Sequence, residues 1–212
     1  MTPAADANSA GPRMPPDPSR RLRLLMVGSS IFEQWPNPAA AFPGCEVTNA
    51  AVGGTQTTDW IEKLPGCLDQ HRPDVLSLYC GSNDLADGRD ADRVVDNLCR
   101  LRAQLSDHDP AAGMIFFNVI QCPAKREMWE TVRRVNQRFR ETLPNGDTVV
   151  NTNTIFVDDQ LTPPDNTPGM FLDDGVHLTA KGYFVLAAHA RGELMRHRWP
   201  QLDELMPSDF QP

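Results

Sequence analysis

The sequence lacks any apolar run that could cross a membrane and any concentration of positive charge. No uninterrupted apolar stretch approaches the roughly 20 residues that span a bilayer. The 20 lysines and arginines are scattered along a chain of formal net charge −8, so no basic stripe is available to hold a phosphate backbone. We therefore expect a soluble protein with no membrane span and no nucleic-acid partner.

Cysteine is scarce, and its spacing is not that of a metal or redox site. The five cysteines are odd in number, form no Cys-x-x-Cys pair and mostly lie inside apolar segments, where cysteine behaves as a small hydrophobic residue. This pattern favours structural thiols and a cytoplasmic location. Four histidines show no metal-ligand spacing and are expected at surfaces or helix ends: His71, His108, His189 and His197.

Nucleotide-binding motifs are also missing. Gly53-Gly54 is not followed by the Lys-Ser or Lys-Thr of a P-loop, and the chain has no Gly-x-Gly-x-x-Gly fingerprint. The Gly-x-Ser-x-Gly elbow of the other large class of α/β esterases is absent too. The sequence therefore predicts no cofactor, and a different fold from those esterases.

The length of 212 residues suits one domain with a substantial core. Residues 1–20 hold five prolines and no apolar run, so we expect a disordered leader there and not a signal peptide. The domain is expected over residues 21–200, followed by a tail at 201–212.

Short apolar segments alternate with segments of helical periodicity. The strands are expected at Leu22–Val27, Cys45–Asn49, Asp74–Cys80, Met114–Gln121 and Thr148–Phe156. The helices are expected at Thr57–Gln70, Asp92–Leu105, Glu127–Leu143 and Thr179–Arg198, the first of them divided into two pieces at Pro65.

This alternation predicts an α/β fold, in which right-handed crossovers place helices on both faces of a parallel sheet. We expect a three-layer α/β/α sandwich with a flavodoxin-like five-stranded sheet in the order 2-1-3-4-5. The long irregular stretch Asp158–Asp173 is either an ordinary surface loop or a loop beside the substrate.

Residues that follow the strands are the candidates for a site, because open parallel sheets bind ligands beyond the carboxyl ends of their strands. Ser30 follows the first strand, Gly54 the second and Asn83 the third, while Asp174 and His177 precede the last helix. Ester hydrolysis needs a hydroxyl nucleophile, a base, a carboxylate that orients the base, and donors for an oxyanion. Each of these parts has a candidate at the same edge.

We assign Ser30 as the nucleophile, His177 as the general base and Asp174 as its orienting carboxylate. The three-residue spacing of Asp174 and His177 lets the carboxylate hold Nδ1 while Nε2 faces the serine. The expected oxyanion hole comprises the N–H groups of Ser30 and Gly54 and the side-chain amide of Asn83. The adjacent Asp173 is expected to be solvated.

These blocks, in this order, resemble those of the SGNH hydrolases, also called the GDSL esterase and lipase family, from about Leu22 to Leu194. The family's first block usually reads Gly-Asp-Ser, and Ser29 stands here in place of the aspartate. The resulting Gly-Ser-Ser form is most similar to members of the platelet-activating-factor acetylhydrolase type. It also leaves Ser29 as an alternative nucleophile.

The resemblance implies a serine esterase that forms an acyl-serine intermediate on a small-molecule ester, with short acyl groups favoured by the absence of a large inserted lid. The segment Gln121–Trp129 would line the acyl pocket or belong to the core, and Trp35 and Trp60 have the same two interpretations. The alternatives are an acyltransferase with the same triad, a non-catalytic binding domain and a flavodoxin-like receiver. The natural ester and the oligomeric state stay open.

Overall fold

A computed structural model describes residues 20–156 and 169–196 of the chain. The expected leader and tail, and residues 158–168 of the irregular stretch, lie outside the described residues. Strands are β1 (Leu22–Gly28), β2 (Cys45–Asn49), β3 (Val75–Tyr79), β4 (Gly113–Phe117) and β5 (Thr148–Val150). Helices are α1 (Ser30–Glu33), η1 (Pro38–Ala41), α2 (Thr57–His71), α3 (Ser82–Ala86), α4 (Ala91–His108), η2 (Pro123–Met128), α5 (Trp129–Thr142), α6 (Asn153–Phe156) and α7 (Ala180–Arg196).

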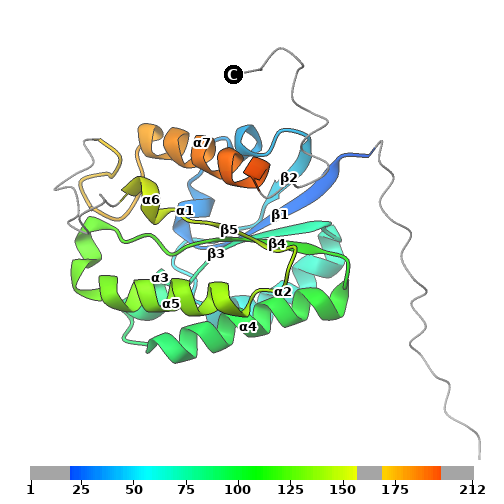
Figure 1. The fold of residues 1–212 in the computed structure, drawn as a ribbon, viewed down its shortest axis with the longest axis horizontal. Coiled ribbons are helices and arrows are strands. Elements are labelled where there is room, and N and C mark those ends of the chain that lie inside the picture. Colours follow the sequence, from blue (N-terminus) through cyan, green and yellow to red (C-terminus); the bar gives the residue numbers. More distant parts are fainter. Residues whose placement is uncertain (1–19, 157–168, 197–212) are drawn as a thin grey trace, which may run out of the picture.

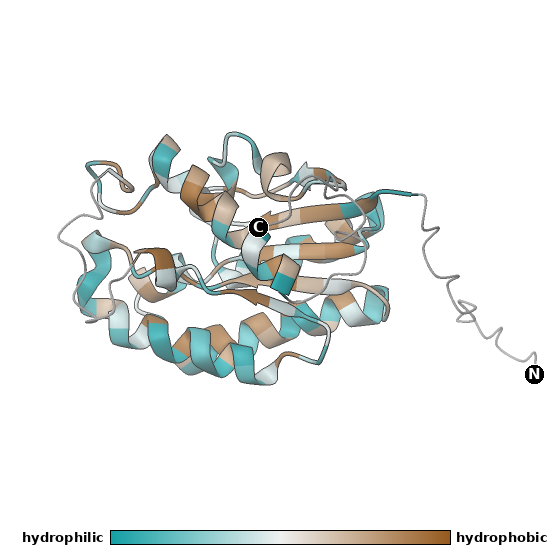
Figure 2. Ribbon diagram, turned by 45° about the horizontal axis from the view of Figure 1, so that its top comes forward, coloured by the Kyte–Doolittle hydropathy of each residue, from teal (hydrophilic) through white to brown (hydrophobic). Residues whose placement is uncertain are grey.

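The five strands form one parallel sheet in the order β2-β1-β3-β4-β5, which confirms the predicted topology. Helices α1, α6 and α7 cover one face, and α2, α4 and α5 cover the other (Figure 1). Because successive side chains of a strand point to opposite faces, Leu24 and Met26 of β1 join one hydrophobic cluster and Leu25 and Val27 the other. The apolar strands and the hydrophilic outer faces of the helices are visible in Figure 2.

The fifth predicted strand is wrong beyond Val150. There the side chains of successive Asn and Thr residues bind backbone groups and turn the chain into α6. Thr152 Oγ1 donates to the Asn118 carbonyl at 2.9 Å, and Asn153 Oδ1 accepts from the Gln121 N–H at 2.8 Å. The predicted strand to Gln121 also ends early, at Phe117.

The predicted division of the first helix at Pro65 is wrong too. Proline removes one N–H and leaves the carbonyl four residues earlier without its helical partner. In α2 that carbonyl belongs to Ile61, and it accepts a hydrogen bond from Gln104 Nε2 of α4 at 2.9 Å. The helix therefore continues through the exposed Pro65 to His71.

No helix among residues 20–156 and 169–196 is long and apolar enough to cross a membrane. All five cysteines are free, and Cys45, Cys80 and Cys122 are buried.

Candidate active site

The turn after β1 is fixed by close contact with β3. Gly28 has φ +133°, and a Cβ atom there would lie 1.9 Å from the carbonyl oxygen of Tyr79. Only glycine fits so close an approach at this backbone conformation. The next N–H, that of Ser29, donates to the same Tyr79 oxygen at 3.0 Å. The chain then turns directly into α1, which starts at Ser30.

Ser30, and not Ser29, faces the histidine. Ser29 is 2% exposed and precedes the first turn of α1, where its carbonyl accepts from the N–H groups of Phe32 and Glu33. Ser30 is partly exposed, and its Oγ lies 2.9 Å from His177 Nε2. With Ser29 in this position, the Ser30 hydroxyl lies within hydrogen-bond distance of His177.

Asp174 holds His177 through both of its carboxylate oxygens. Oδ2 lies 2.6 Å from His177 Nδ1, and Oδ1 accepts from the N–H groups of Val176 and His177 at 2.8 and 2.9 Å. The hydrogen bond from the His177 ring and these two backbone bonds lower the pKa of Asp174 to about 2. Because Nδ1 donates to the carboxylate, Nε2 is free to accept the proton of Ser30.

The segment that carries Asp174 and His177 is held by hydrogen bonds within the segment, and the helix that follows it is bonded to α1. Leu172 N–H donates to the His177 carbonyl at 2.8 Å, and Phe171 and Leu178 form an antiparallel bridge. Beyond it, the hydroxyl of Tyr183 in α7 donates to the Ile31 carbonyl of α1 at 2.9 Å. The helix that follows the histidine is thereby bonded to the turn that carries the serine.

Gly54 and Asn83 are linked through Thr55. Asn83 Nδ2 donates to the Thr55 carbonyl at 3.0 Å, which leaves the second hydrogen of that amide for another acceptor. Thr55 Oγ1 in turn donates to the Gly28 carbonyl at 3.0 Å. Gly54 has φ +74° with nothing within 4 Å of a Cβ position, so its backbone conformation, and not lack of space, accounts for glycine here.

A buried network joins the segment after β2 to the segment after β3. Asp84 is 1% exposed and accepts from both the N–H and the hydroxyl of Thr57, the first residue of α2. Asn97 Nδ2 of α4 also donates to the Thr57 hydroxyl, at 2.8 Å. Asp84 was not among the site residues predicted from the sequence. In the sequence, its position directly after Asn83 was the feature that pointed to it.

Glu33 is a second residue that the sequence analysis missed. It lies three residues after Ser30, and a Cβ atom on Gly53 would come within 2.4 Å of its Oε2. The carboxylate therefore occupies the space where a side chain at position 53 would lie. The signal in the sequence was the three-residue spacing, which places two side chains on one side of a helical turn.

The segment Gln121–Trp129 combines core residues with a charged side chain. Cys122 and Trp129 are buried, and Trp129 Nε1 donates to the Cys122 carbonyl at 2.9 Å, so both belong to the core. Trp35 and Trp60 are buried core residues as well. Lys125 is half-buried, and its Nζ donates to the Oγ and the carbonyl of Ser82 at 2.8 and 3.2 Å.

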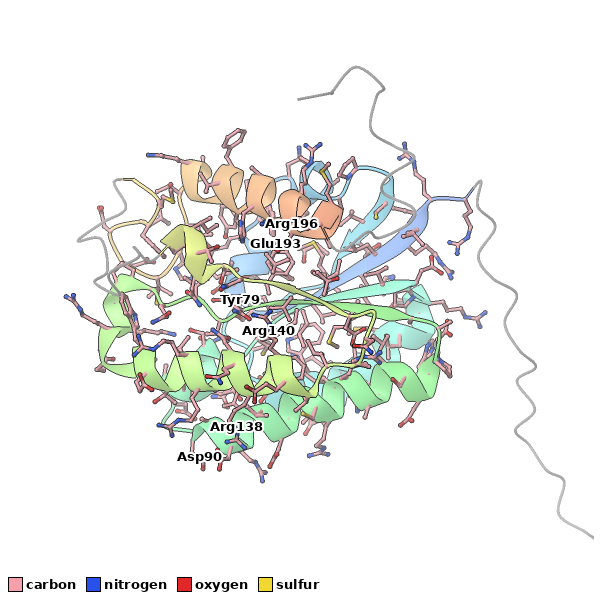
Figure 3. The ribbon with its side chains drawn as sticks, viewed as in Figure 1. Tyr79, Asp90, Arg138, Arg140, Glu193 and Arg196 are labelled. Carbon is pink, nitrogen blue, oxygen red and sulfur yellow. The ribbon has the colours of Figure 1, made fainter. Side chains whose placement is uncertain are left out.

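Among the described residues, no three His, Cys, Asp or Glu side chains are grouped so that they could hold a metal ion. Asp173 is exposed, as expected. A cavity of about 440 Å³ lies at the outer edge of β5, lined among others by Arg140 of α5 and Glu193 of α7 (Figure 3), and none of the predicted site residues lines it.

The chain is similar to known ester hydrolases in sequence and fold. Residues 27–185 match the model of the GDSL-like lipase/acylhydrolase family. An arylesterase of Vibrio mimicus is 25% identical over 190 residues, which cover 82% of this chain and 89% of that protein.

Solved structures share the fold. A GDSL-like lipase from Bacteroides thetaiotaomicron has a TM-score of 0.68 at 19% identity, covering 83% of this chain and 89% of its own. A structure from Streptococcus pneumonia whose name refers to platelet activating factor has a TM-score of 0.68 at 19% identity, covering 83% of this chain and 85% of its own. The predicted fold is confirmed.

Proposed function

The chain belongs to the GDSL-like lipase/acylhydrolase family of ester-hydrolysing enzymes, and from that premise we propose that it is a serine esterase for short acyl groups. The observation that carries the proposal is the continuous hydrogen-bonded array from Asp174 through His177 to Ser30, with distances of 2.6 and 2.9 Å. This is the arrangement that activates a serine hydroxyl for attack on a carbonyl.

In the proposed mechanism, Ser30 Oγ attacks the ester carbonyl while His177 Nε2 takes its proton. Collapse of the tetrahedral intermediate breaks the bond to the alcohol, which leaves with the proton from His177. The Ser30 acyl ester is then cleaved by a water molecule that His177 deprotonates, and His177 returns the proton to Ser30 Oγ as the carboxylic acid is released. The N–H groups of Ser30 and Gly54 and the Asn83 amide would stabilise the oxyanion.

The preference for short acyl groups is supported by the exposure of the site. The side chains of His177 and Asp174 are 26% and 47% exposed, so the array opens on solvent. An open site buries little of a long acyl chain. Burial of apolar surface supplies most of the binding free energy for such a chain, so an open site binds it weakly. Water also reaches the acyl-serine readily, which favours hydrolysis over transfer to another alcohol. A cytoplasmic location remains a prediction, supported by the free thiols.

The test is a series of p-nitrophenyl esters from acetate to palmitate, assayed with the wild type and Ser30→Ala. We expect kcat/KM to fall as the acyl chain lengthens and Ser30→Ala to lower kcat by about 10⁴. When a competing acceptor alcohol is added to the assay, the free acid, and not a new ester, should remain the main product. A Ser30→Ala variant with most of its activity would overturn the mechanism, and a maximum at long chains would overturn the substrate class.

A further inference from the structure

Lys125 connects two parts of the proposed site that are far apart in the sequence. It lies in η2, the short helix after β4, and Nζ donates to the Oγ of Ser82 at 2.8 Å and to its carbonyl at 3.2 Å. Ser82 opens α3 and directly precedes Asn83. Burial lowers the pKa of Lys125, while the nearby Cys122 and Glu127 act in the opposite direction. Among the described residues, the Oγ and the carbonyl of Ser82 are the hydrogen-bond acceptors of Nζ.

The same short helix contacts the turn that carries the proposed base. Ala124 N–H donates to the Gly175 carbonyl at 3.1 Å, between Asp174 and His177. Gly175 has φ +63°, and a Cβ atom there would lie 3.2 Å from the Ala124 Cβ, so the two segments are in close contact. Neighbouring residues of η2 therefore bond to the Asn83 turn on one side and to the His177 turn on the other.

We propose that Lys125 is a positioning residue that fixes the Asn83 turn relative to the Asp174–His177 turn. The inference rests on the proposed function, in which Asn83 and His177 act on one substrate carbonyl. Helix α3 has five residues, and its N-cap, Gly81, supplies no side-chain hydrogen bond. A helix this short is not rigid on its own, and displacements of about 1 Å in a catalytic group cost up to 10²-fold in rate. The Lys125 ammonium fixes Ser82, the first residue of α3, which directly precedes Asn83.

The experiment compares Lys125→Met, Lys125→Arg and Arg126→Met by steady-state kinetics on a short p-nitrophenyl ester. Methionine keeps the length of the side chain and removes the donor, so we expect kcat to fall about tenfold while KM changes less than about twofold. Arginine should restore most of the loss because it can still donate to Ser82. Arg126→Met is the control, since Arg126 lies over the Trp129 ring at 5.9 Å and makes no hydrogen bond to Ser82.

A double-mutant cycle with Asn83→Ala separates positioning from a general loss of stability. If Lys125 acts through Asn83, Lys125→Met should change kcat by less than about twofold once Asn83 is removed. Urea midpoints establish that each variant is folded at the assay temperature. An unchanged kcat in Lys125→Met, or the same loss in both backgrounds, would overturn the inference. Ser30→Ala, measured alongside, tests the proposed function independently, because an enzyme that depends on Ser30 but not on Lys125 refutes only the positioning role.

Discussion

At the scale of single residues, the packing of Gly28 against Tyr79 decides which serine faces the histidine. The Tyr79 carbonyl occupies the space of a side chain at Gly28 and accepts the next N–H, that of Ser29. Ser29 is buried by this contact, and the following residue, Ser30, is directed to His177. The two adjacent serines are distinguished by backbone geometry that the sequence does not show.

Asp174→Asn should lower kcat by about 10³ to 10⁴, because an amide at this position can donate to Nδ1 and so favours the wrong tautomer of His177. Asp173→Asn is the matched control. Its carboxylate is exposed, and we expect kcat within about twofold of the wild type. Equal losses in the two variants, measured by steady-state kinetics at neutral pH, would contradict the assignment of Asp174.

The Asp174 carboxylate should also affect how the free energy of unfolding depends on pH. The pKa of Asp174 is about 2 in the folded protein, below the ordinary value of 3.8. A lowered pKa means that the unfolded chain binds the proton more readily, so the contribution to stability is full above the ordinary value and disappears as the pH falls through about 2. In urea titrations from pH 7 to pH 2, the stability difference between wild type and Asp174→Asn should therefore narrow only below about pH 4.

The proposed site residues could be picked out from the sequence because each lies in a short motif that follows a strand or precedes a helix. Ser30, Gly54, Asn83, Asp174 and His177 were all proposed in this way. The contacts of Lys125 with Ser82 join residues 43 positions apart, and no local pattern signals such a pair. The spacing of Glu33 from Ser30 was visible in the sequence, but its contact with Gly53 was not, because the chain must fold back after β2 to create that contact.

At the scale of elements, side-chain hydrogen bonds decide where helices and strands end. The amide of Asn136 bonds to both the N–H and the carbonyl of Val119 at 2.8 and 2.9 Å, so β4 ends although the apolar Val119 and Ile120 follow. Gln104 likewise lets α2 pass through Pro65 by bonding to the Ile61 carbonyl. The periodicity of the sequence predicted which elements form, whereas these tertiary bonds set their limits.

Asp84→Asn should weaken the connection between α2 and α3. An asparagine amide keeps one acceptor but places a donor beside Thr57, where the carboxylate now accepts from the N–H and the hydroxyl. We expect a loss of about 2 to 3 kcal/mol in the free energy of unfolding, measured by urea denaturation at pH 7. Asp87→Asn, at a side chain 61% exposed, should change it by less than about 0.5 kcal/mol. A neutral Asp84→Asn would contradict the network.

At the scale of the whole molecule, the sheet separates two hydrophobic clusters with different relations to the site. Phe116 points into the cluster beneath α4 and α5 and packs edge-on against Phe139 at 4.7 Å. Phe117 points into the other cluster and packs edge-on against Phe32 of α1 at 5.0 Å. The second cluster therefore packs directly against α1, which carries Ser30.

Phe116→Leu and Phe117→Leu should destabilise the fold alike, each by about 1 to 2 kcal/mol in urea denaturation. Their effects on kcat should differ. Phe117→Leu leaves space beneath α1 and is expected to lower kcat about three- to tenfold through displacement of Ser30, while Phe116→Leu leaves kcat unchanged. Similar kcat values for the two variants would show that the packing beneath α1 does not position the serine.

The most direct test of the central claim is the intact mass of the protein after reaction with a fluorophosphonate, because such a probe labels an activated serine without requiring a known substrate. The account predicts one adduct on the wild type, mapped to the peptide position of Ser30, no adduct on Ser30→Ala and strongly slowed labelling of His177→Ala. A folded wild-type protein that takes up no probe, or one whose adduct persists in Ser30→Ala, would contradict it.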